Sequence, residues 1–210
     1  MTLRLRRIVQ WAIAGLALAI GVVAAIAAFG PGNSRPRFQA VDITGVPWGK
    51  EFALTDHLGR KRSLADFRGK TVALYFGYTH CPDMCPTTLA LLGGALRKMG
   101  SDADAVQGLF VTVDPKRDTP EILSQYVPSF YPSFLGLYGD DAATAHAAQE
   151  FKAYFHANPP DERGSYTVDH SSQLYVIDPT GRLRLYIKAD AMTPDSIAHD
   201  LRALLGEARS

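Results

Sequence analysis

The two cysteines of the chain, Cys81 and Cys85, lie four positions apart in "YFGYTHCPDMCPTTLALL". A thiol pair at this spacing can form a structural disulfide, work as a redox couple or bind a metal ion. A disulfide between residues so close in sequence closes a very short loop and removes little entropy from the unfolded chain. We therefore expect the thiols to take part in chemistry rather than to stabilise the fold.

Metal and redox chemistry both fit the position of the thiols. "TVALYFGY" predicts a buried strand and "PTTLALLGGALRKM" predicts a helix, so the cysteines lie at the junction between them. Residues four apart share one face of a helix, and a helix N-terminus favours the thiolate form by lowering the thiol pKa. A thioredoxin-type redox pair has the pattern Cys-x-x-Cys, whereas the insert here is one residue longer. The wider pair can admit an ion, and soft thiolates prefer Cu(I), or zinc when two further ligands are present.

A third metal ligand is expected at His170. It lies in "TVDHSSQLYVIDP", just before a strand that we expect to pair with the strand leading to the cysteines. Thioredoxins carry a cis-proline at the matching place, but residues 167–172 contain no proline, so an imidazole can take that position. A loop histidine hydrogen-bonded to the backbone is the alternative. His80 adjoins Cys81 but points in another direction, and surface positions are expected for His57, His146, His156 and His199.

The remaining patterns predict a thioredoxin-like α/β fold with three αβα layers. A β-hairpin in residues 51–70 comes first, and strands and helices then alternate in the order βαβαβα. Asp118 is expected to cap the second of these helices, with Pro120 in its first turn. A polar loop at 157–169, a hairpin around "DPTG" and a helix capped by Thr193 complete the fold.

The N-terminal segment predicts a single transmembrane helix. Residues 8–29 form an uncharged apolar run of about 22 residues, long enough to cross a hydrocarbon core of about 30 Å. Arginines within residues 1–7 favour a cytoplasmic N-terminus, residues 30–44 form a linker, and residues 45–210 form the folded domain. A cleaved signal peptide is the alternative, with "AIA" at 25–27 as its cleavage site. In both cases we expect the folded domain in the periplasm or an equivalent exported space.

The charge balance argues against a nucleic-acid partner. The chain has 22 basic and 21 acidic residues and a net charge of +1, too little to attract a polyanion. Its hydrophobic content of 47% and charged content of 20% are typical of a globular protein. We therefore expect no nucleic-acid partner.

Three blocks of the sequence closely resemble the Sco/SenC family of membrane-anchored copper proteins with a thioredoxin-like fold. The blocks are "FGYTHCPDMCPTTL", "VTVDPKRDTPEILSQYV" and "VDHSSQLYVIDPTGRL". The resemblance implies that Cys81, Cys85 and His170 are copper ligands and that the protein delivers copper to the binuclear site of cytochrome c oxidase. It implies a single-pass protein of the cell inner membrane with its C-terminal domain in the periplasm. The implied partners are the copper-bearing oxidase subunit and either another periplasmic copper chaperone or a thiol reductant.

Three residues near the motif and one alternative function remain open. Asp114 and Asp118 match the "DP…D" motif of the family, but helix capping and turn formation account for both. Met84 lies between the cysteines, and we expect it to pack inward rather than to bind metal. The competing function is a thiol-disulfide oxidoreductase that reduces the cysteines of the oxidase copper site, in which Cys81 attacks and Cys85 resolves.

Overall fold

The computed structural model describes residues 3–29 and 38–209, which fall into two compact units. The first unit contains one helix, α1 (Leu3–Phe29). Large apolar side chains of α1 are exposed, namely Trp11, Ile13, Leu16, Leu18, Ile20, Val22 and Val23. Within the part of the chain that is described, no helix meets the length and apolarity that crossing a membrane requires. Residues 30–37 of the predicted linker lie outside the described residues.

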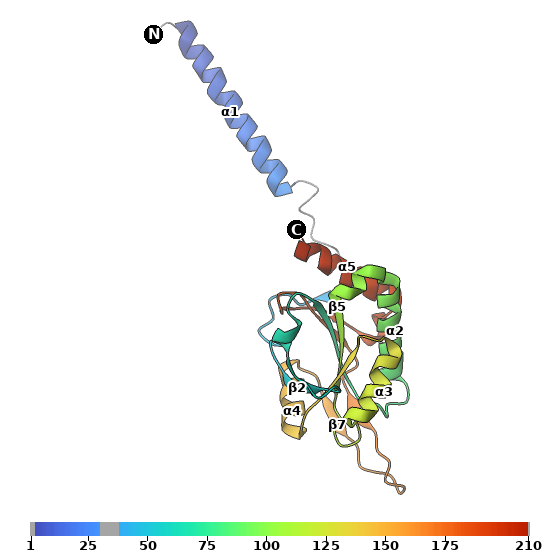
Figure 1. Cartoon of the computed structure of the whole chain (residues 1–210). Coiled ribbons are helices and arrows are strands. Elements are labelled where there is room, and N and C mark those ends of the chain that lie inside the picture. Colours follow the sequence, from blue (N-terminus) through green and yellow to red (C-terminus); the bar gives the residue numbers. More distant parts are fainter. Residues whose placement is uncertain (1–2, 30–37, 210) are drawn as a thin grey trace. The chain divides into compact units, whose positions relative to one another are not determined.

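The second unit is built around an eight-stranded mixed sheet (Figure 1). Its strand order is β1-β10-β9-β4-β5-β6-β2-β3. The strands are β1 (Val41–Asp42), β2 (Ala53–Asp56), β3 (Lys61–Ser63), β4 (Thr71–Gly77), β5 (Val106–Thr112), β6 (Leu135–Tyr138), β9 (Leu174–Ile177) and β10 (Leu183–Ile187). Strands β4, β5 and β6 are parallel, whereas β9 runs antiparallel beside β4. Every residue of β4 and β5 is buried, as continuous apolar runs in a covered parallel sheet predict.

Helices lie on both sides of this sheet. The α-helices are α2 (Met84–Met99), α3 (Pro120–Phe130), α4 (Asp141–Glu150) and α5 (Pro194–Arg209), and short 3-10 helices are η2 (Leu64–Phe67), η3 (Gly100–Ala105) and η4 (Ala189–Ala191). Helix α2 packs against α5 and α3, while α4 contacts β2 and lies across the sheet from α2 in Figure 1. The result is a thioredoxin-like α/β fold with a central mixed sheet. The predicted order of strands and helices is therefore confirmed, as are the early hairpin and the "DPTG" hairpin.

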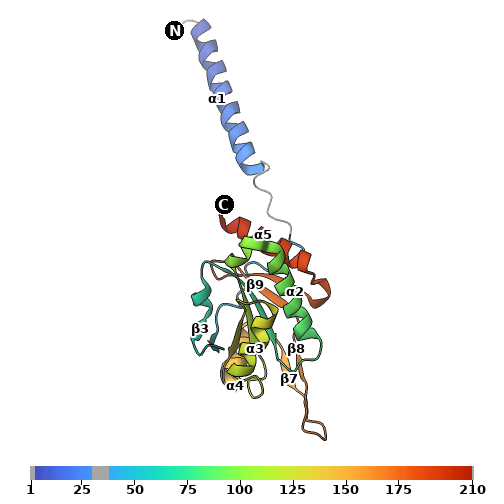
Figure 2. The same cartoon turned by 45° about the vertical axis from the view of Figure 1, so that its right-hand side comes forward.

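Two local predictions are wrong. The N-cap of α3 is Thr119, whose hydroxyl accepts a hydrogen bond from the Ile122 N–H at 3.4 Å, rather than Asp118. The ends of the predicted polar loop at 157–169 form strands of a second, two-stranded sheet, β7 (Phe155–Ala157) and β8 (Val168–His170). The segment between these strands projects away from the rest of the second unit (Figure 2). Cross-strand pairing of β7 with β8 therefore extends into both ends of a segment whose composition favours turns.

Candidate metal centre

The strand-to-helix junction places the two thiols differently. Strand β4 ends at Gly77 and α2 begins at Met84, so Cys81 precedes the helix and Cys85 lies in its first turn. The side chain of the N-cap residue, Asp83, makes no capping hydrogen bond to this helix. The Cys85 N–H instead donates to the Cys81 sulfur at 3.5 Å. Cys81 is half-buried, Cys85 is buried, and both are free thiols. The junction therefore presents one accessible and one enclosed sulfur to the same point.

His170 lies beside the two cysteines. Its Nε2 lies 3.3 Å from the Cys85 Sγ, and one ligand atom from each of the three residues lies within 4.8 Å of the others. The strand prediction that placed His170 here is confirmed, because β9 pairs with β4 directly after it. The Nδ1 atom contacts the Ser171 carbonyl oxygen at 2.9 Å, so it carries the ring proton in the neutral tautomer and leaves Nε2 free to bind a metal.

Burial shapes the electrostatics of the site. It raises the pKa of the Cys85 thiol, and an opposing backbone hydrogen bond from Tyr78 does not offset that effect. The expectation that the helix N-terminus lowers the pKa is therefore wrong for Cys85. Burial also lowers the pKa of His170, against the opposing effects of the Ser171 and Phe76 backbones and the Asp169 charge. A neutral imidazole and a protonated, enclosed thiol describe the metal-free site, and a metal ion must replace the thiol proton.

Two tyrosines from the "YFGY" stretch hold the His170 ring, and the sequence patterns did not single them out. The Tyr75 and Tyr78 rings meet the imidazole edge to face, with ring centroids 6.0 and 5.7 Å away and interplanar angles of 84° and 89°. Both tyrosines are buried. Aromatic residues flanking a glycine at a strand end were the available signal for this contact.

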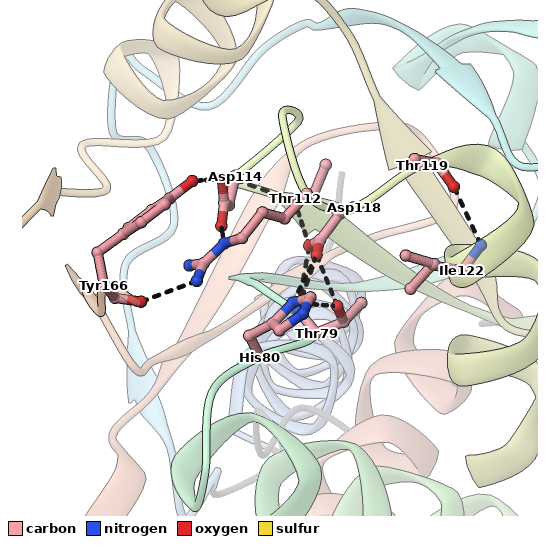
Figure 3. Close-up of polar contacts among 9 residues, drawn as sticks. Thr79, His80, Thr112, Asp114, Asp118, Thr119, Ile122 and Tyr166 are labelled. Carbon is pink, nitrogen blue, oxygen red and sulfur yellow. Dashed lines mark hydrogen bonds and ion pairs between the residues drawn. The ribbon is translucent and has the colours of Figure 1, made fainter. Parts of the chain in front are cut away.

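Asp118 connects the cysteine loop to the end of β5 (Figure 3). Its carboxylate is 1% exposed and accepts hydrogen bonds from the Thr79 N–H and from the hydroxyls of Thr79 and Thr112, the last two at 2.6 Å. His80 Nδ1 lies 3.1 Å from the Thr79 hydroxyl and 3.8 Å from Asp118. The helix-cap interpretation of Asp118 is thus replaced by a buried link to a residue two positions before Cys81.

Asp114 makes a second link, toward the strand that carries His170. Its carboxylate accepts a hydrogen bond from the Tyr166 hydroxyl at 2.8 Å (Figure 3) and pairs with the Arg117 guanidinium. Arg117 also donates to the Tyr166 carbonyl oxygen at 2.8 Å and stacks 3.6 Å from the centre of the Tyr166 ring. The predicted turn is present, because the Asp114 carbonyl accepts from the Arg117 and Asp118 N–H groups. Asp114 therefore joins the loop after β5 to the approach to β8.

The predictions for Met84 and the other histidines are partly confirmed and partly wrong. Met84 is 38% exposed and lines, with residues of the cysteine loop and β8, a shallow pocket of about 280 Å³ at the metal centre, so the prediction that it packs inward is wrong. His57 is half-buried, and its Nδ1 accepts a hydrogen bond from the Gly136 N–H at 3.0 Å, so it is no free surface residue. Exposure is confirmed for His146, His156 and His199, and His80 is exposed as well.

Comparison with known proteins finds one matching family model and several related proteins. The SCO1/SenC family model matches residues 42–206. The mouse protein named "Protein SCO2 homolog, mitochondrial" is 42% identical over 151 residues, which are 71% of this chain and 59% of the mouse protein. The chain thus spans less than two thirds of the length of that relative.

Solved structures with copper bound share the fold. The chain is similar to Bradyrhizobium japonicum ScoI with copper bound, with 39% identity, a TM-score of 0.69, and coverage of 75% of this chain and 99% of that one. It is also similar to yeast Sco1 with copper bound, with 32% identity, a TM-score of 0.68, and coverage of 78% and 89%. The group formed by Cys81, Cys85 and His170 is one that could bind copper.

Proposed function

This chain belongs to the SCO1/SenC family, and on that premise we propose that it is a copper chaperone that binds copper through Cys81, Cys85 and His170. We propose that it delivers this copper to the binuclear copper site during assembly of cytochrome c oxidase. The observation that carries the proposal is the convergence of two thiol sulfurs and one imidazole nitrogen within 4.8 Å. Two soft thiolates and an imidazole suit Cu(I), and the same donors also accept Cu(II).

The accessibility of the site supports a carrier rather than a permanent metal site. Cys81 and His170 are half-buried and border the pocket at the metal centre, whereas Cys85 is enclosed. Three protein ligands leave a further coordination position for a ligand of the acceptor protein. Copper can then move by stepwise ligand exchange, with the accessible Cys81 leaving before the buried Cys85.

We also propose that residues 8–29 anchor the protein in the cell inner membrane, with residues 1–7 in the cytoplasm and the domain from 45 to 210 in the periplasm. The large apolar side chains exposed between residues 11 and 23 support this, because transfer of such side chains from water into an apolar environment is favourable. The partners are then the copper-bearing subunit of the oxidase and a periplasmic copper chaperone or thiol reductant. Retention in carbonate-washed membranes tests the anchor, and a mature N-terminus near Ala28 would contradict it.

A thiol-disulfide oxidoreductase is the second candidate function. The observation that favours it is the pairing of a half-buried Cys81 with a buried free Cys85 four residues later, as an attacking and a resolving thiol require. Such an enzyme reduces an acceptor disulfide with two electrons while its own thiols form a disulfide, and it has no need of His170. The two candidates therefore differ in what the loss of the imidazole should do.

The decisive experiment is an anaerobic Cu(I) titration of the reduced full-length protein, followed by a test in cells. We expect His170→Ala to weaken Cu(I) binding at least tenfold, while His156→Ala, an exposed histidine on neighbouring β7, should bind like wild type. In a strain lacking the protein, Cys81→Ser, Cys85→Ser and His170→Ala should all fail to restore oxidase at limiting copper. The opposite result would be normal oxidase assembly with His170→Ala but none with the serine variants, even in excess copper. The proposed function would then be that of a thiol reductant rather than a copper chaperone.

A further inference from the structure

Tyr75 places a buried hydroxyl beside the metal centre. Tyr75 lies on β4 with 0% of its surface exposed, and within the described residues its hydroxyl makes no hydrogen bond. A buried donor without an acceptor destabilises a protein, and such groups are rare outside functional sites. The packing around this side chain therefore needs a physical explanation.

Tyr75 is packed against two of the three candidate ligands. A Cβ atom added to Gly77 would lie 2.6 Å from the Cys85 Sγ and 3.0 Å from Cε1 of Tyr75, so the sulfur and the ring edge meet over the same point of the backbone. The Tyr75 ring also meets the His170 ring edge to face. Burial, and after it the charge of Cys85, raise the pKa of Tyr75, as expected for a hydroxyl close to that sulfur.

We propose that the Tyr75 hydroxyl donates a hydrogen bond to the Cys85 thiolate in the copper-loaded protein. The inference rests on the proposed copper site and makes Tyr75 a positioning residue for it. When copper binds, the Cys85 thiol releases its proton to solvent, and the sulfur becomes a negatively charged acceptor where it was a weak donor. The buried thiolate has no contact with bulk water, and the Tyr78 backbone N–H is the other donor directed at it. The hydroxyl thus gains a charged acceptor when the metal is bound.

This hydrogen bond predicts a spectroscopic signature. A donor on a ligand sulfur withdraws electron density from it, which stabilises the reduced metal and moves the sulfur-to-Cu(II) charge-transfer band to higher energy. In Tyr75→Phe we expect that band at longer wavelength, a lower Cu(II)/Cu(I) midpoint potential and Cu(I) affinity weaker by about tenfold. The ring and its contacts with His170 remain in this variant.

In the metal-free protein, Tyr75→Phe should not lower the stability. Because Tyr75→Phe removes an unsatisfied buried hydroxyl, the metal-free variant should unfold at the same temperature as wild type or higher. Copper should then raise its unfolding temperature by less than it raises that of wild type. A residue with a purely structural role would lower the unfolding temperature of both forms.

A matched tyrosine variant serves as the control in the full-length protein. Tyr175→Phe removes a buried hydroxyl on β9 that is hydrogen-bonded to Gln173, and it should not move the charge-transfer band. A Tyr75→Phe spectrum and potential identical to wild type, or an equal shift in Tyr175→Phe, would overturn the proposal. If wild-type protein binds no copper, the proposed function itself fails, and this inference fails with it.

Discussion

Gly77, the last residue of β4, gives the Cys85 sulfur its place at the end of the sheet. A Cβ atom there would come within 2.6 Å of the sulfur and 2.9 Å of Phe110, closer than real contacts allow. The absent side chain therefore lets the buried thiol, the Tyr75 ring and Phe110 meet over the strand end. At the scale of single residues, the metal centre therefore depends on the absence of a side chain at Gly77 as well as on its ligands.

Gly77→Ala should therefore displace Cys85 and weaken the site. We expect a loss of about 1–3 kcal/mol in the free energy of unfolding, as for other overpacked cores, together with weaker Cu(I) binding. Urea unfolding and Cu(I) competition titration measure the two effects. Gly206→Ala in α5 is the control, because an added Cβ meets no atom within 4 Å there, and alanine favours a helix by up to about 1 kcal/mol. Unchanged copper binding in Gly77→Ala would show that the sulfur is not held by this contact.

At the scale of elements, neighbouring residues at the start of α3 perform different tasks. Thr119 caps the helix, whereas Asp118 turns into the core and binds Thr79 of the cysteine loop and Thr112 at the end of β5. Asp114 and Arg117 extend the same link to Tyr166 before β8. The loop between β5 and α3 therefore joins the segments that carry the cysteines and His170.

The pair Asp118→Ala and Thr119→Ala separates these tasks. Asp118→Ala leaves the N–H of the half-buried Thr79 and two hydroxyls without their acceptor, so we expect a loss of about 2–4 kcal/mol in stability and weaker copper binding. Thr119→Ala removes only the cap and should cost about 1 kcal/mol while copper binding stays as in wild type. Denaturant unfolding and copper titration of both variants decide the matter. Equal loss of copper binding in the two would mean that the helix start, not the Asp118 carboxylate, holds the loop.

At the scale of the whole molecule, two aspartates close hairpins on opposite sides of β4 and β5 in the sheet. Asp56 accepts hydrogen bonds from the Leu58 and Arg60 N–H groups and from Arg62, and Asp178 is bonded in the same way to Thr180 and Arg182. Burial by itself would raise the pKa of each carboxyl, but these hydrogen bonds outweigh it and leave both pKa values below the usual range. Both hairpins are therefore stabilised by an ionised carboxylate.

This arrangement predicts a pH-dependent loss of stability. Because the folded pKa of Asp56 is lower than its unfolded value of about 3.9, its contribution is fully present above that value and is lost as the pH falls through the folded pKa. Asp56→Asn should be less stable than wild type at pH 7, and the difference should shrink below about pH 4. Urea unfolding at several pH values measures this, with exposed Asp190→Asn as the control. A difference that is constant with pH would contradict the role of the charge.

Much of this protein follows from local sequence patterns. Apolar runs without breaks specify β4 and β5, helical spacing of leucines specifies α2, and Thr193 with Pro194 marks the start of α5. These signals are local because hydrogen-bond geometry and side-chain period act over a few residues. The cysteine spacing and the place of His170 before a strand then sufficed to predict a metal site.

Only the tertiary structure decided how those residues act together. His170 reaches Cys85, 85 positions earlier, because β9 pairs with β4, and the same packing buries Cys85 and raises its pKa against the local effect of the helix N-terminus. The buried role of Asp118, the pairing of β7 with β8 and the exposure of Met84 also depend on contacts between distant segments. Desolvation and long-range pairing depend on the whole packed chain, so no local pattern encodes them.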